Sequence, residues 1–109
     1  MAYDPGLAQR IREIMPNNTN LREKEMFGGM AFMLNGNMAC GVIGDELMVR
    51  VGKEAHEGAH AQPHTRPFDF TGKPMRGWVV VTPEGLAEDK DLQAWVQQGT
   101  EYALSLPPK

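Results

Sequence analysis

Residues 26–51, MFGGMAFMLNGNMACGVIGDELMVRV, decide the fold because they predict two consecutive β-hairpins with few charges. Asn35-Gly36 lies between two apolar runs, and a two-residue type I′ turn requires positive φ at both central positions, which Asn and Gly tolerate. Gly44-Asp45 provides a second two-residue turn between apolar runs. The segment therefore predicts a three-stranded antiparallel meander.

Strict pairing from the first turn predicts the register of the meander. It places Met33 opposite Met38 and Ala31 opposite Cys40. Because side chains alternate across a strand, one face of the meander is then wholly apolar. That face consists of Ala31, Met33, Met38, Cys40, Val42, Leu47, Val49 and Val51.

The opposite face of the meander is half apolar, although the outer face of an antiparallel sheet is usually polar. We expect something to cover it, and its apolar side chains are the candidates for an interaction surface. These are Met30, Phe32, Leu34, Ile43 and Met48. Methionine adapts to binding surfaces as well as to cores. Two alternatives stay open: a second subunit covers this face, or the loop at residues 63–77 folds back over it.

Helical patterns flank the meander. Apolar residues recur at helical spacing over residues 5–15 and from about 88 to 106, and a short helix is expected over about 53–61. Residues 17–24 are polar apart from Leu21 and predict a connection, while residues 78–81 predict a strand. This order predicts an α+β fold, a two-layer sandwich in which an antiparallel sheet carries the N- and C-terminal helices on one face.

The bulk composition is typical of one soluble domain spanning residues 1–109. Of these residues 41% are hydrophobic and 23% are charged, which argues against disorder. No apolar run approaches the roughly 20 residues of a membrane helix, and MAYDPGLAQR at the N-terminus lacks the pattern of a signal peptide. We therefore expect a cytoplasmic protein. The single cysteine, Cys40, lies on the apolar face and predicts a buried thiol rather than a nucleophile.

HEGAH at residues 56–60 fits the HExxH pattern, in which two histidines one helical turn apart bind zinc and the glutamate polarises water. A zinc-dependent hydrolase at this motif is the enzyme alternative. The glycine inside the required helix and the polar flanks argue against it, and a third ligand would be His64 or Glu54 only by proximity. The sequence favours a solvated helix with no cofactor, and His56 and His60 are secondary candidates for metal.

The irregular segment at residues 63–77 holds the densest charged group of the chain, Arg66, Asp69, Lys73 and Arg76. Such cations beside a glycine favour an anion or an acidic partner. The alternative is that Asp69 pairs with Arg66 or Arg76 and holds the loop in place, while the phenylalanines of the loop pack into the core. Loop charges are usually structural or solvated, which favours this alternative.

Direct nucleic-acid binding would use a local basic patch of Arg50, Arg66, Lys73 and Arg76. The formal net charge of −3 argues against it, as does the pI near 5.5. Neutralisation of phosphates by lysine and arginine supplies most of the affinity for nucleic acid. A protein partner is therefore favoured over a nucleic acid.

Four segments carry a resemblance to a known family: EKEMFGGMAFMLNGNMACGV at residues 23–42, LMVRVG at 47–52, RPFDFTGKPMRGWVVV at 66–81 and LPPK at 106–109. Together they resemble the TfoX N-terminal domain family, named for the TfoX/Sxy regulators of natural competence in bacteria. The resemblance implies an α+β fold with an antiparallel sheet and flanking helices, and it supplies no catalytic residues. Combined with the apolar second face, it favours a non-enzymatic regulatory or protein-interaction module that self-associates as a homodimer.

Overall fold

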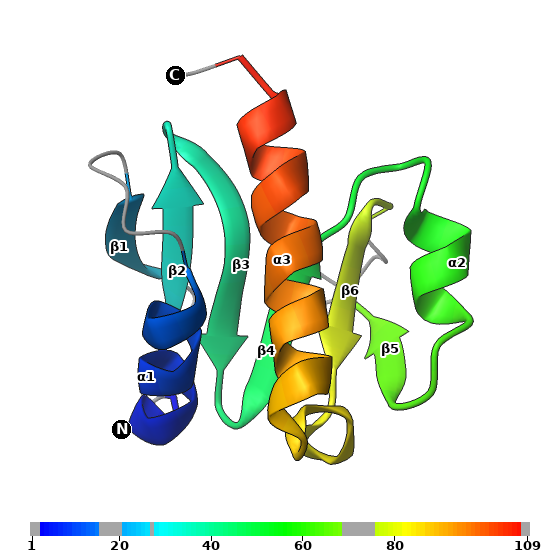
Figure 1. Cartoon of the computed structure of the whole chain (residues 1–109), viewed down its shortest axis with the longest axis horizontal. Helices are drawn as coiled ribbons and strands as arrows, with labels where there is room; N and C mark the ends of the chain where they lie inside the picture. The colour runs from blue at the N-terminus through cyan, green and yellow to red at the C-terminus, as the bar shows by residue number, and fades with distance from the viewer. Residues whose placement is uncertain (1–2, 16–20, 27, 69–75, 108–109) are drawn as a thin grey trace.

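The computed structural model describes residues 3–15, 21–26, 28–68 and 76–107. Within these ranges six strands form one antiparallel sheet, with helices packed against it (Figure 1). The strands are β1 (Leu21–Met26), β2 (Gly29–Leu34), β3 (Asn37–Ile43), β4 (Glu46–Arg50), β5 (Thr65–Pro67) and β6 (Trp78–Val81). The helices are α1 (Pro5–Ile14), α2 (His56–His60), the 3-10 helix η1 (Pro83–Leu86) and α3 (Asp89–Ser105).

The main core lies between the sheet and the helices. Ile11 of α1 and Val96 of α3 join Val42 and Val49 of the sheet in one buried cluster, and Ala59 of α2 belongs to it as well. The predicted α+β fold, with the N- and C-terminal helices on one face of an antiparallel sheet, is therefore confirmed. None of the helices in the described ranges combines the length and the apolarity needed to cross a bilayer.

The first hairpin turn forms as predicted, but the register of its strands changes after two residue pairs. Asn35 and Gly36 have φ angles of 54° and 83°, and Met33 lies opposite Met38. The register then shifts between Phe32 and Met33, so that Phe32 and not Ala31 lies opposite Cys40. The predicted pairing of Ala31 with Cys40 is wrong because a bulge places one extra residue in β3.

This bulge exchanges the two faces of β2. Phe32 and Leu34 belong to the main core beneath the helices together with Cys40 and Val42. Because side chains alternate along a strand, Ala31 and Met33 then lie on the second face. The predicted assignment of Ala31, Met33 and Met38 to the helix-covered face is therefore wrong, while that of Cys40, Val42, Leu47, Val49 and Val51 is confirmed.

The sheet also extends beyond the predicted meander. Residues 17–24 were expected to form a connection, but β1 begins at Leu21 and pairs with β2 along its whole length. On the other side β6 pairs with β4, and β5 follows it as the opposite edge. Residues 22–25 of β1 are exposed and charged, and charges on an edge strand prevent pairing with another chain.

Candidate functional site

The five residues predicted to form one interaction surface do not share a face of the sheet. Phe32 and Leu34 are fully buried in the main core, and the half-buried Met30 packs against the same cluster. Met48 lies on the second face, where it is 1% exposed, and the half-buried Ile43 packs beside it. The predicted surface is therefore wrong, because the bulge turns its three β2 residues toward the helices.

Part of the loop at residues 63–77 folds over the second face. Phe68 forms a buried cluster with Met48 and Val80, and its ring centroid lies 5.2 Å from that of Trp78. Two alternatives were open for the cover of this face, a second subunit or the loop. The loop is observed to cover it at Phe68. Residues 69–75, which include Asp69 and Lys73, lie outside the described residues.

Arg66 and Arg76, the two charged residues of the loop that the structure describes, have different surroundings. Arg66 makes two hydrogen bonds to the carboxylate of Glu46, through Nε to Oε2 at 3.0 Å and through Nη2 to Oε1. This pair joins β5 to β4 across the intervening β6. Arg76 is exposed near the start of β6. The predicted ion pair with Asp69 falls outside the described residues.

Arg50 of the predicted basic patch is held between two aromatic rings. Its guanidinium carbon lies 5.8 Å from the centroid of Trp78 and 5.5 Å from that of Tyr102. Cation–π contacts of this kind fix the position of a guanidinium group. Arg50 and Arg66 therefore each contribute to the packing of the fold, whereas Arg76 is exposed.

The HEGAH motif forms the whole of α2 and attaches that helix to the sheet. His56 Nδ1 accepts a hydrogen bond from the backbone N–H of Gly77 at 2.9 Å, and His60 Nε2 lies 3.0 Å from the carbonyl oxygen of Trp78, to which it donates. Partial burial lowers the pKa of His56, and the nearby His60 and Arg76 lower it further. Across the described ranges, no group of His, Cys, Asp and Glu has the arrangement of a metal site.

The thiol of Cys40 is sealed in the main core, as predicted. Burial raises its pKa to about 12. A thiolate is the nucleophilic form of cysteine, and a thiol with this pKa stays protonated at neutral pH.

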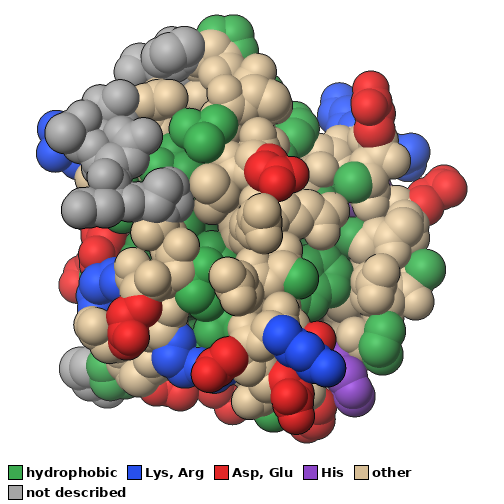
Figure 2. Space-filling model, in the orientation of Figure 1, with side chains coloured by type: hydrophobic (Ala, Val, Ile, Leu, Met, Phe, Trp, Pro, Cys, Tyr) green, Lys and Arg blue, Asp and Glu red, His purple; other side chains and the backbone are tan. Residues whose placement is uncertain are grey.

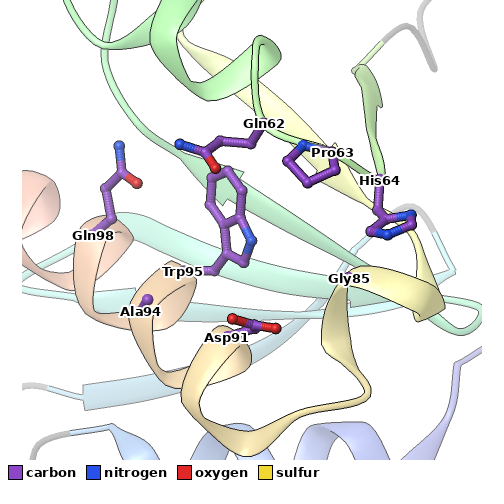
Figure 3. A pocket seen from close by; sticks show the side chains of 8 residues that line it. All are labelled: Gln62, Pro63, His64, Gly85, Asp91, Ala94, Trp95 and Gln98. Atoms are coloured by element: carbon purple, nitrogen blue, oxygen red, sulfur yellow. The ribbon is translucent and has the colours of Figure 1, made fainter.

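A recess that the sequence analysis did not predict lies between α3 and the turn that joins α2 to β5 (Figure 3). Its volume is about 220 Å³. The indole of Trp95 stands at its centre in Figure 3, with the Gln62 side chain on one side and the Asp91 carboxylate on the other. The lining consists of Gln62, Pro63, His64, Gly85, Asp91, Ala94, Trp95 and Gln98.

The backbone around His64 shapes one wall of this recess. His64 has a φ of 63°, a left-handed conformation that is uncommon for residues other than glycine. Its carbonyl oxygen accepts hydrogen bonds from both the N–H and the Oγ1 of Thr82, at 2.8 Å and 3.1 Å, and these hold the conformation. At Gly85 a Cβ atom would lie 3.0 Å from the Cβ of His64 and 2.8 Å from Val81 Cγ1, so glycine lets the two segments approach.

The family model of the TfoX N-terminal domain matches residues 13–103. The match includes the whole sheet, α2 and the lining of the recess. It confirms the resemblance and covers three of the four segments that carry it, whereas LPPK at residues 106–109 lies outside the match. No curated protein and no solved structure matches the chain.

Proposed function

Because the chain belongs to the TfoX N-terminal domain family, we propose that it is a non-enzymatic regulatory module that acts through contact with another protein. The family match over residues 13–103 is the observation that carries this proposal. The TfoX N-terminal domain is not a known enzyme family. By analogy with the regulators that give the family its name, the process regulated is natural competence.

The geometry of the nucleophile and metal-ligand candidates supports a binding role. His56 and His60 hydrogen-bond to the backbone at the start of β6, and Cys40 is buried with a raised pKa. Each of these three side chains has a structural explanation within the fold. These contacts support a structural role for all three side chains, and the proposal needs none of them for chemistry.

A complementation experiment tests this absence of catalysis. We expect deletion of the gene in its host to change transcript levels of competence genes, and a chain carrying Cys40→Ala, His56→Gln and His60→Gln to restore them as the wild type does. Glutamine retains polar atoms for the backbone contacts. Transcript levels are measured by quantitative PCR, and circular dichroism verifies that the variant is folded. A folded variant that fails to complement would refute the non-enzymatic proposal.

We further propose that the chain self-associates through the second face of the sheet. The half-buried Met38, Ile43 and Trp78 surround the buried cluster on that face. The edges of the sheet are unsuited to pairing, because β1 is charged and β5 has three residues including Pro67. A second copy would therefore meet this chain face to face rather than edge to edge.

We expect light scattering after size-exclusion chromatography to give twice the chain mass of 12.1 kDa. Ile43→Glu should return the mass to that of one chain, because a carboxylate buried in an apolar contact loses its hydration. Leu104→Glu is the matched control, since Leu104 is 44% exposed on α3. Wild-type protein that has the mass of one chain at every concentration would contradict self-association.

A further inference from the structure

We propose that the recess beside Trp95 binds an arginine side chain of the partner protein. This inference rests on the proposed protein-binding function and adds the chemistry of one contact. The recess of about 220 Å³ is smaller than the roughly 300–1,000 Å³ of typical small-molecule pockets. Its size suits a single inserted side chain rather than a cofactor.

The polar groups of the recess are available for a ligand. Among the described residues, the side chains of Gln62, Asp91, Trp95 and Gln98 form no hydrogen bond with one another or with the rest of the fold. A carboxylate accepts hydrogen bonds only, and each amide offers one accepting oxygen. The half-buried face of Trp95 adds a surface on which a cation stacks favourably. Together they offer acceptors and a π face, which complement a cationic donor.

The charge around the recess favours the same ligand. Figure 2 shows acidic side chains gathered at the lower end of the molecule, where α3 begins (Figure 1). The exposed acidic residues of this region are Glu84, Glu88, Asp89 and Asp91. Among the described cations, Lys90 lies in the same stretch of chain, and Arg10 already pairs with Asp89 at 2.9 Å. The local charge is therefore negative and disfavours phosphates and carboxylates.

Glu84 precedes Gly85, which lines the recess. A hydrogen bond to its own backbone N–H lowers the pKa of Glu84 first, and the nearby His64 contributes. His64 lines the recess. The ionised Glu84 thus adds one negative charge beside a residue of the lining.

Arginine fits these features better than lysine. The guanidinium group is planar, stacks on an aromatic face and presents a fork of donors that matches a carboxylate. In the recess the indole of Trp95 offers the face, and the carboxylate of Asp91 offers the two oxygens (Figure 3). A lysine ammonium would satisfy the charge but leave the planar surface without a matching partner.

Nuclear magnetic resonance of the full chain tests the proposal with Nα-acetyl-arginine methylamide as the probe. We expect saturable shifts of the indole N–H signal of Trp95, with a dissociation constant in the millimolar range. The indole signal of Trp78 should remain in place, which makes it an internal control. The citrulline analogue has the same shape without the charge, and it should bind at least about fivefold more weakly.

Two variants with the same change of charge separate the recess from the acidic surroundings. Asp91→Asn should weaken arginine binding about fivefold, whereas Asp89→Asn, two residues earlier and outside the recess, should leave it nearly unchanged. Equal shifts of both indole signals, equal binding of citrulline, or equal effects of the two variants would overturn the proposal. Such a result would leave the complementation experiment, and with it the proposed function, unaffected.

Discussion

Replacing Phe32 by alanine is expected to lower the free energy of unfolding by about 3–5 kcal/mol. Phe32 is 0% exposed and is among the largest fully buried side chains of the described core. Its removal loses the free energy gained by burying an aromatic ring. It also leaves a cavity beneath the helices that a rigid sheet cannot close. Urea unfolding followed by circular dichroism measures the loss.

Met33→Ala is the matched control because it changes the next residue of the same strand. Met33 is half-buried on the second face, so its truncation should cost less than half as much as that of Phe32. The strictly paired register that the turn predicts would reverse the order, since Met33 would then lie in the core and Phe32 outside it. A larger loss for Met33→Ala than for Phe32→Ala would therefore contradict the bulged register.

The hairpin turns could be predicted from sequence because their signal is local. Asn35-Gly36 adopts positive φ angles that few other pairs tolerate. The bulge could not be predicted in the same way, because Ala39 and Cys40 are both small and apolar and either register leaves a plausible pattern. The size of the side chains offers the remaining signal: the observed register places Phe32 in the main core.

The edge strand β1 and the structural role of the HEGAH motif were harder to predict from sequence, for a related reason. The charges of β1 resemble those of a connecting loop, but they are equally typical of an edge strand. The pairing of this strand with β2 is set by tertiary structure. The spacing of HEGAH is that of a zinc helix, but its histidines bond to the backbone of Gly77 and Trp78, which follow many residues later. Local pattern cannot reveal such contacts.

The recess beside Trp95 shows the same limit most clearly. Its lining comes from three segments, residues 62–64, Gly85 and residues 91–98. None of these has a motif, and Trp95 follows the apolar spacing of α3 like a core residue. The available signal was composition, since glutamines and an aspartate flank this tryptophan on the helix.

Gly99→Ala is expected to lower the free energy of unfolding by at least about 2 kcal/mol. A Cβ atom at this position would lie 2.4 Å from the carbonyl oxygen of Ala39, and a backbone atom of a central strand cannot move aside as a flexible side chain does. Overpacking of a core costs up to about 3 kcal/mol or more, and the better helix propensity of alanine returns about 1 kcal/mol. Thermal and urea unfolding both report the difference.

Gly58→Ala provides a control of opposite sign. Gly58 also lies in a helix, but a Cβ atom there meets nothing within 4 Å, so only the gain in helix propensity of up to about 1 kcal/mol remains. Two identical substitutions should thus shift stability in opposite directions, because one helix lies against β3 and the other is open at that residue. If both variants were stabilised, α3 would not pack on β3 at Gly99, and the close contact between helix and sheet would be disproved.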